Sequence, residues 1–99
     1  MAYLKTQCKN VLFSRHTVTR MLERNLSVSE LQTAIEQSEV VEEYPNDHPY
    51  PSYLLLSWVN DTPVHVVIAL NETENACIII TVYRPDREKW SDDFKRRRP

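Results

Sequence analysis

A histidine and two arginines recur at helical spacing near the start of the chain. At about 100° per helical residue, His16, Arg20, Glu23 and Arg24 share one face of a helix predicted from Arg15 to about Asn25. Histidine exchanges protons near neutral pH, and arginine presents forked donors that suit phosphate oxygens. This face therefore has the residue types needed for phosphodiester chemistry. The alternative is a solvent-exposed face stabilised by pairs such as Arg20–Glu23.

A second histidine lies in an apolar strand predicted from Val64 to Leu70. Alternation places His65 on the face opposite Val64, and we expect an acid or base there only if that face opens onto a cleft. The alternative is a hydrogen-bonded, half-buried histidine. A following strand, Ala76 to Tyr83, is predicted to place Cys77, Ile79, Thr81 and Tyr83 on one face and Ala76, Ile78, Ile80 and Val82 on the other. Tyr83 would then lie near His65 and donate to a phosphate oxygen, or merely close the strand end.

Charge is segregated along the chain, although the net charge is only −2. Residues 1–25 carry five cations and one acid, residues 26–75 carry nine acids and no Lys or Arg, and residues 76–99 carry seven cations and four acids. If the fold joins the two basic ends, they form a positive patch able to attract phosphates. We expect the final cations, Lys95, Arg96, Arg97 and Arg98, to hold a flanking nucleic acid. The alternative is a mixed, solvated surface with no partner.

Composition excludes several classes of protein. The 99 residues suit one domain, and the absence of glycine excludes Gly-rich nucleotide-binding loops. Neither the two cysteines nor the spacing of the three histidines suits a zinc site, so we expect no metal and no cofactor. No apolar run is long enough for a membrane span and none at the start resembles a signal peptide, so we expect a reduced, cytoplasmic protein without membrane contact.

The pattern predicts an α+β fold with two N-terminal helices packed on one face of a four-stranded antiparallel sheet. The first helix is expected to bury Val18, Met21 and Leu22. The second, from about Val28 to Gln37, begins at a capping box formed by Ser27 and Glu30 and is expected to bury Val28, Leu31, Ala34 and Ile35. Strands are predicted at 40–44, 53–59, 64–70 and 76–83. Residues 1–99 are taken as one domain, with a lead-in at 1–13 and a polar, basic tail at 84–99 in which Trp90 and Phe94 serve as anchors.

Several short segments occur in the order typical of a small bacterial family of unknown function. They are Phe13-Ser14-Arg15-His16, Arg20-Met21-Leu22-Glu23-Arg24, Val40 to Pro45, Pro63 to Val67, Ile80-Thr81-Val82-Tyr83 and Trp90. The order of elements is similar to that of the RelE and BrnT toxins and of barnase-like, metal-independent ribonucleases. The resemblance implies a toxin fold, an RNA substrate and an antitoxin partner of the zinc-finger MqsA type. The chain departs from the family at Asn25 and Asn60-Asp61, where glycines are common.

These observations lead to a toxin-like endoribonuclease as the first hypothesis. His16 and His65 would share the proton transfers, Arg20 and Arg24 would stabilise the phosphate, and Tyr83 would orient it. A second hypothesis is a non-catalytic module whose acidic middle binds a basic protein. A third is a ParE-like inhibitor of a protein target. The sequence leaves the oligomeric state and the distance between the two histidines open.

Overall fold

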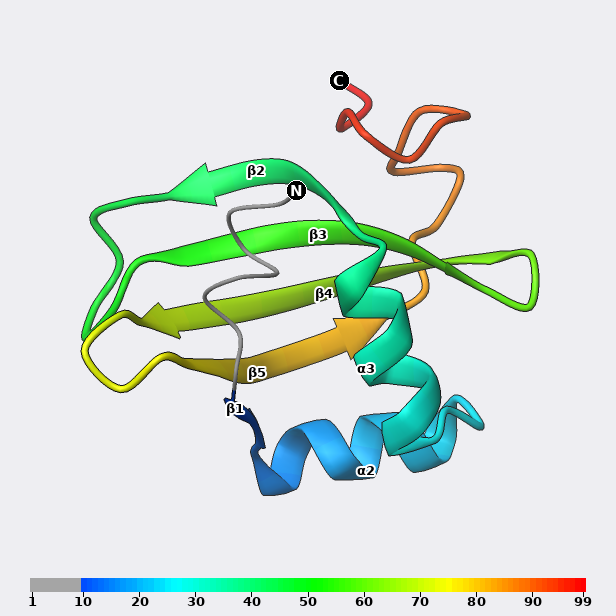
Figure 1. Cartoon of the computed structure of the whole chain (residues 1–99). Coiled ribbons are helices and arrows are strands. Elements are labelled where there is room, and N and C mark those ends of the chain that lie inside the picture. Colours follow the sequence, from blue (N-terminus) through cyan, green and yellow to red (C-terminus); the bar gives the residue numbers. More distant parts are fainter. Residues whose placement is uncertain (1–9) are drawn as a thin grey trace.

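The computed structural model of the protein describes residues 10–99 (Figure 1). The elements in chain order are β1 (Asn10–Phe13), α2 (Arg15–Glu23), α3 (Val28–Glu36), β2 (Glu39–Tyr44), β3 (Ser52–Val59), β4 (Thr62–Asn71) and β5 (Ala76–Tyr83). The strands form one sheet in the order β1-β5-β4-β3-β2. All neighbours are antiparallel except β1 and β5, which run parallel. The predicted α+β class is confirmed. The strand count is corrected from four to five, because residues 10–13 of the expected lead-in pair with β5.

Both helices begin at serine caps. The Thr17 backbone N–H donates to the Ser14 hydroxyl at 3.0 Å, which satisfies one of the free donors of the first turn. At the start of α3, Ser27 and Glu30 form the predicted capping box. These caps fix where the two short helices start, and the shared core then holds them in place.

The buried face of α2 differs from the predicted one. Thr17 is fully buried, whereas Val18 and Leu22, expected in the core, are 41% and 73% exposed. The reason is that α2 lies along the outer edge of β5, where the Thr17 hydroxyl donates to the Ile79 carbonyl at 2.8 Å (Figure 1). A helix in this position buries a narrow stripe rather than a broad apolar face. Val28 of α3 is also exposed, at 47%, contrary to expectation.

The main core lies between the helices and one face of the sheet. Leu31, Ala34 and Ile35 of α3 are buried there, as predicted. The remaining buried members of this core are Met21, Leu26, Leu55, Val59, Val64, Val66, Ile68, Leu70, Cys77, Ile79 and Val82. Cys77 is not a free thiol, so the expectation of a reduced chain is not met at this residue. Cys8 lies outside the described residues.

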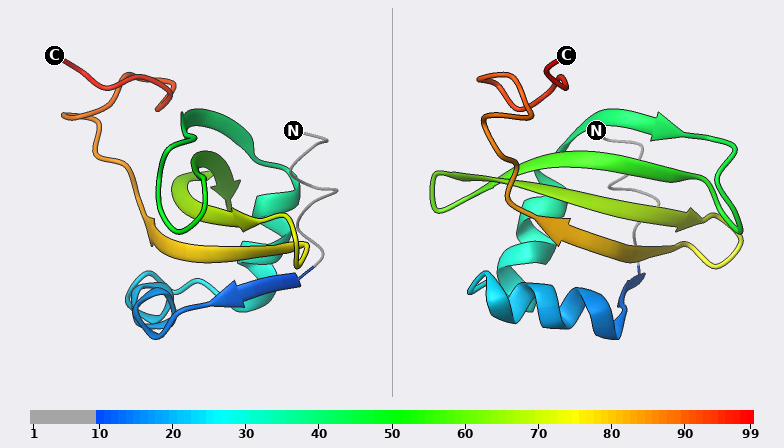
Figure 2. Two further views of the ribbon diagram at one scale, coloured as in Figure 1. Left: turned by 90° about the vertical axis from the view of Figure 1, so that its left-hand side faces the viewer. Right: turned by 180° about the vertical axis from the view of Figure 1, so that it is seen from behind.

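A smaller core covers one end of the opposite sheet face. Trp90 and Phe94, the predicted anchors, pack there with Leu54 and Leu56 of β3 and are each 3% exposed. Figure 2 shows the segment after β5 on the side of the sheet away from α3. We call residues 86–98 the C-terminal segment. It leaves the other end of this sheet face uncovered.

A β-bulge in β5 changes the predicted alternation of side chains. Val67 pairs with Thr81 and Ile68 pairs with Ile79, so Ile80 has no partner across the strand. As a result Cys77, Ile79 and Val82 join the helix-side core, whereas Tyr83 packs on the other side. The prediction that Val82 and Tyr83 face opposite ways is confirmed, and the prediction that Ile79 and Tyr83 share a face is wrong.

Asparagine and aspartate take four of the five left-handed backbone positions of residues 10–99, and Phe94, with a φ of 61°, takes the fifth. Asn25, Asn60, Asp61 and Asn75 have φ values of 55°, 51°, 63° and 52°. These two residue types tolerate the left-handed region best after glycine. Asn60-Asp61 therefore forms the β3–β4 hairpin without glycine, and β4 begins at Thr62, two residues before the predicted start at Val64.

Candidate functional site

His16 lies on the exposed side of α2 beside the bulge of β5. Its Nε2 atom is 3.4 Å from the Thr81 hydroxyl. The neighbouring Thr17 fixes α2 to the edge of β5, so the backbone next to His16 is anchored by a buried hydrogen bond. His16 is therefore an exposed imidazole held beside a strand, which is an accessible position for proton transfer.

Arginines follow His16 along α2 and continue at the end of β5. Arg20 approaches Glu23 at 3.5 Å, and both side chains are nearly half exposed. Arg84, directly after β5, donates from Nη2 to the Arg24 carbonyl at 3.2 Å. We call Arg20, Arg24 and Arg84 the edge cations. They join part of the first basic segment to part of the last one, which is the condition stated above for a positive patch, while Lys5 and Lys9 lie outside the described residues.

His65 is fully buried beneath the C-terminal segment. Its Nε2 atom lies 2.8 Å from the Phe94 carbonyl oxygen and its Nδ1 atom lies 3.1 Å from the Tyr83 hydroxyl. A carbonyl only accepts, so Nε2 carries the proton and donates, and Nδ1 accepts from Tyr83. Burial lowers the pKa of His65, and the nearby Arg97 charge acts in the same direction, so the neutral imidazole is favoured.

Tyr83 is paired with His65 across β4 and β5 and their rings meet edge to face. This confirms the predicted neighbourhood of the two side chains. Burial raises the pKa of the Tyr83 hydroxyl, which therefore remains protonated at neutral pH. Tyr83 is only partly buried, so it is the more accessible member of the pair.

A glutamate–arginine pair closes this end of the sheet. Arg97 donates from Nε and Nη2 to the two carboxylate oxygens of Glu42, both at 3.2 Å. The Tyr44 hydroxyl donates to the same carboxylate. This bond, followed by those from Arg97, lowers the pKa of Glu42. The Arg97 guanidinium also lies 4.7 Å from the centre of the Trp90 ring, which is cation–π geometry.

The four terminal cations differ in their surroundings. Lys95 forms a 2.8 Å ion pair with Glu39, and Arg97 binds Glu42. Arg98 binds Asp92 at 3.0 Å and the Arg87 carbonyl. The Arg96 side chain has no ion-pair partner within residues 10–99. Three of the four cations thus fasten the C-terminal segment, and Arg96 alone among them is left for an external anion.

The two histidines are held by different residues of β5. His16 contacts Thr81, and His65 contacts Tyr83. Across the two strands, Thr81 pairs with Val67 and Tyr83 pairs with His65, and these four residues lie on the same sheet face. Two residues of a strand span roughly 6.5 Å. Thr81, which His16 contacts, and Tyr83 are thus two residues apart on β5, whereas His65 has Tyr83 and the C-terminal segment around it.

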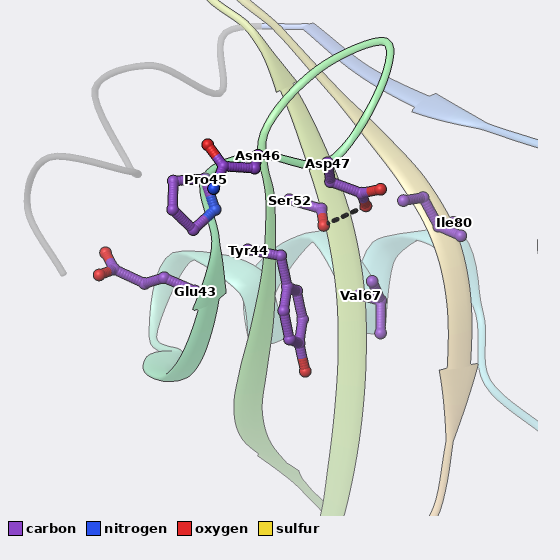
Figure 3. Close-up of a pocket in the computed structure, with 8 residues that line it drawn as sticks. All are labelled: Glu43, Tyr44, Pro45, Asn46, Asp47, Ser52, Val67 and Ile80. Carbon is purple, nitrogen blue, oxygen red and sulfur yellow. Dashed lines mark hydrogen bonds between the residues drawn. The ribbon is translucent and has the colours of Figure 1, made fainter.

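An open pocket next to this site was not predicted. It occupies about 620 Å³ on the uncovered part of the sheet face and is lined by Glu43, Tyr44, Pro45, Asn46, Asp47, Ser52, Val67 and Ile80 (Figure 3). The sequence signals were weak, because the bulge that exposes Ile80 has no glycine or proline to mark it. Residues 45–51 lie between two predicted strands, and their three prolines are typical of a loop but do not indicate a pocket.

The sequence analysis expected neither a metal site nor a membrane-spanning segment. Residues 10–99 contain no group of three or more His, Cys, Asp or Glu side chains arranged to hold a metal ion. Among the helices described, none has the length and apolar character that crossing a membrane requires.

Comparison with known proteins gives one family. A family model described as a domain of unknown function (DUF4258) matches residues 13–84, which is most of the chain. No curated protein and no solved structure matches the chain. The chain therefore matches a family of unknown function, as expected. The resemblance to RelE and BrnT stays a prediction.

Proposed function

We propose that this chain, which belongs to the DUF4258 family, is a toxin-like, metal-independent endoribonuclease. The observation that carries the proposal is the position of an exposed histidine on the same helix as two arginines, in contact with Thr81, which is two residues from the Tyr83–His65 pair. Accessible proton-transfer groups and cations near the phosphate are what RNA transesterification without a metal requires.

In the proposed reaction, His16 takes the proton of the ribose 2′-hydroxyl and the 2′-oxygen bonds to phosphorus. The bond from phosphorus to the 5′-oxygen breaks, and the Tyr83 hydroxyl turns its proton from His65 Nδ1 to that leaving oxygen. The products are a 2′,3′-cyclic phosphate and a 5′-hydroxyl. His16 then returns the proton, through water, to the Tyr83 phenolate, which Arg97 stabilises electrostatically. His65 has no exposed surface and acts in this proposal as a positioning residue for Tyr83.

The edge cations would stabilise the phosphate. Arg20 and Arg24 follow His16 by four and eight residues along α2 and its C-cap. Arg84 follows Tyr83 in sequence and binds the Arg24 carbonyl, so these cations continue the edge on which His16 lies. Arg96 is the terminal cation that remains for flanking RNA. Lys95, Arg97 and Arg98 would reach RNA only by giving up the ion pairs that hold the C-terminal segment.

The test is cleavage of total RNA by the purified protein in the presence of EDTA, with the RNA ends mapped. His16→Ala and Tyr83→Phe should each lower the cleavage rate at least a hundredfold, because each removes a proton-transfer group. Thr19→Ala is the matched control, since Thr19 is exposed on the same helix and is outside the site. Cleavage that persists at the wild-type rate in folded His16→Ala protein would refute the mechanism.

A second candidate function is a protein-binding module, including the ParE-like inhibitor and the antitoxin-bound state. The exposed carboxylate of Glu43 next to the open pocket favours it. Glu43→Lys should abolish the capture of a basic partner, whereas Glu36→Lys on α3 should not. Glu42 is unsuitable for this test because its carboxylate binds Arg97. Toxicity that survives in folded His16→Ala protein would favour this function over RNA cleavage.

A further inference from the structure

The open pocket adjoins the proposed reaction centre through consecutive residues of β5. Ile80 lines the pocket, and the next residue, Thr81, contacts His16. Val67 lines the pocket, and two residues before it on the same face of β4 is His65. A nucleotide whose phosphate lies at His16 would therefore have its base near this pocket.

The walls of the pocket suit a flat apolar ring. Tyr44 forms one wall with its ring, and Val67 and the 40% exposed Ile80 form another (Figure 3). Every base has an aromatic face that stacks on such a side chain. The volume of about 620 Å³ lies in the range of small-ligand pockets.

The pocket also contains an ordered carboxylate. Asp47 accepts from the Ser52 hydroxyl at 2.7 Å and from the His48 backbone N–H at 3.1 Å. Each bond occupies a different carboxylate oxygen, and an ionised carboxylate has about four acceptor positions. Each oxygen therefore retains room for one further donor. In Figure 3 this carboxylate points toward Ile80, whereas the carboxylate of Glu43 points away from Val67 and Ile80.

We infer that this pocket is a nucleobase subsite that prefers guanine, with Tyr44 as the stacking wall and Asp47 as the acceptor of the base edge. The inference rests on the proposed function for its substrate class. Guanine carries two adjacent donors, N1–H and the 2-amino group, which match the two oxygens of a carboxylate. Uracil offers one N–H between two carbonyl groups, and the oxygens of these carbonyls are repelled by a carboxylate. The acidic surroundings favour such a donor edge and oppose a phosphate, so the phosphate is left to the edge cations.

Neutral nucleosides test the subsite separately from catalysis. Titration of the full chain with guanosine should shift the methyl NMR signals of Val67 and Ile80. Inosine, which lacks the 2-amino group, should bind at least fivefold more weakly, and uridine at least twentyfold more weakly. Asp47→Asn should weaken guanosine binding at least tenfold, because one acceptor oxygen becomes a donor. Glu36→Gln removes the same charge from an exposed side chain of α3 that does not line the pocket and should change binding less than twofold.

The outcomes separate this inference from the proposed function. Cleavage without guanosine binding, or equal binding of guanosine and uridine, would overturn the subsite and leave the ribonuclease intact. Guanosine binding without any cleavage would support the subsite and count against the ribonuclease. If the peptide Lys-Tyr-Lys shifts the same methyl signals and guanosine does not, the pocket binds protein and the inference is wrong. In the cleavage assay, Asp47→Asn should raise KM for guanine-containing sites more than it lowers kcat.

Discussion

Replacement of His65 by leucine should destabilise the fold by about 2–4 kcal/mol at pH 8. Leucine has a similar size but can neither donate to the Phe94 carbonyl nor accept from the Tyr83 hydroxyl. Each buried polar group left without a partner costs about 1–3 kcal/mol. Added apolar contact with Trp90, whose ring centre lies 4.4 Å from that of His65, offsets part of this cost.

The pH dependence of stability should change in the same variant. Burial places the pKa of His65 in the folded protein below its unfolded value, so the unfolded chain binds more protons as the pH falls. The free energy of unfolding should therefore decrease below about pH 6.5, with a slope of up to roughly 1.4 kcal/mol per pH unit for one proton. His65→Leu should lose this contribution, so its disadvantage relative to the wild type should narrow toward pH 5.

Urea unfolding followed by tryptophan fluorescence at pH 8, 7, 6 and 5 measures both effects. His65→Gln is the matched control, because its amide can donate to Phe94 and accept from Tyr83 without titrating. It should cost less than His65→Leu at pH 8 and should show the same reduced pH slope. A His65→Leu protein as stable as the wild type at pH 8 would refute the argument that the hydrogen bonds of His65 to Phe94 and Tyr83 stabilise the fold.

Four further substitutions probe the fold and its surface. Thr17→Val should cost about 1–3 kcal/mol, because it leaves a buried carbonyl of β5 without its donor; thermal unfolding measures the loss, and an unchanged Tm would contradict it. Ser27→Ala should cost about 1 kcal/mol by removing the capping box of α3, seen as a lower urea midpoint at the same slope. Arg97→Leu should lower the free energy of unfolding by less than about 1 kcal/mol, since the ion pair with Glu42 is partly exposed. It should nevertheless speed proteolysis of the C-terminal segment. Equal proteolysis of the variant and the wild type would show that the pair with Glu42 does not hold this segment. Leu22→Lys should change stability by less than about 0.5 kcal/mol because this leucine is 73% exposed, and a large loss would show that α2 is covered.

Much of the fold could be predicted from local signals. Periodicity of two, interrupted by turn residues, gave the four longer strands to within two residues at each end. Ser27 and Glu30 marked the start of α3 directly. These predictions succeeded because caps and alternation act over a few neighbouring residues.

The errors arose where distant segments meet. The burial of Thr17 depends on a hydrogen bond to Ile79, which is 62 positions away in sequence. Helical periodicity predicted that Val18 and Leu22 are buried, because it depends only on the spacing of apolar residues. It carries no information on whether the helix packs on a sheet face or along a sheet edge. The strand β1 has four residues and becomes a strand only through its pairing with β5.

The candidate site was predictable in composition but not in geometry. Alternation placed Tyr83 near His65 and helical spacing grouped His16 with the arginines. The tail cations were expected to face RNA, yet Lys95 and Arg97 bind glutamates of β2. Nothing in the sequence pattern links Arg97 to Glu42, because the fold that joins them is set by the burial of Trp90 and Phe94.

The lack of glycine has a consequence for the denatured chain. Turns in many proteins use glycine, whose backbone loses the most conformational entropy on folding. Asn25, Asn60, Asp61 and Asn75 reach the same left-handed geometry from a more restricted ensemble. Part of the stability of these turns therefore comes from the lower conformational entropy of the unfolded chain at these positions. Glycine at these positions would ease the folded backbone and enlarge that ensemble, so the two effects would oppose each other.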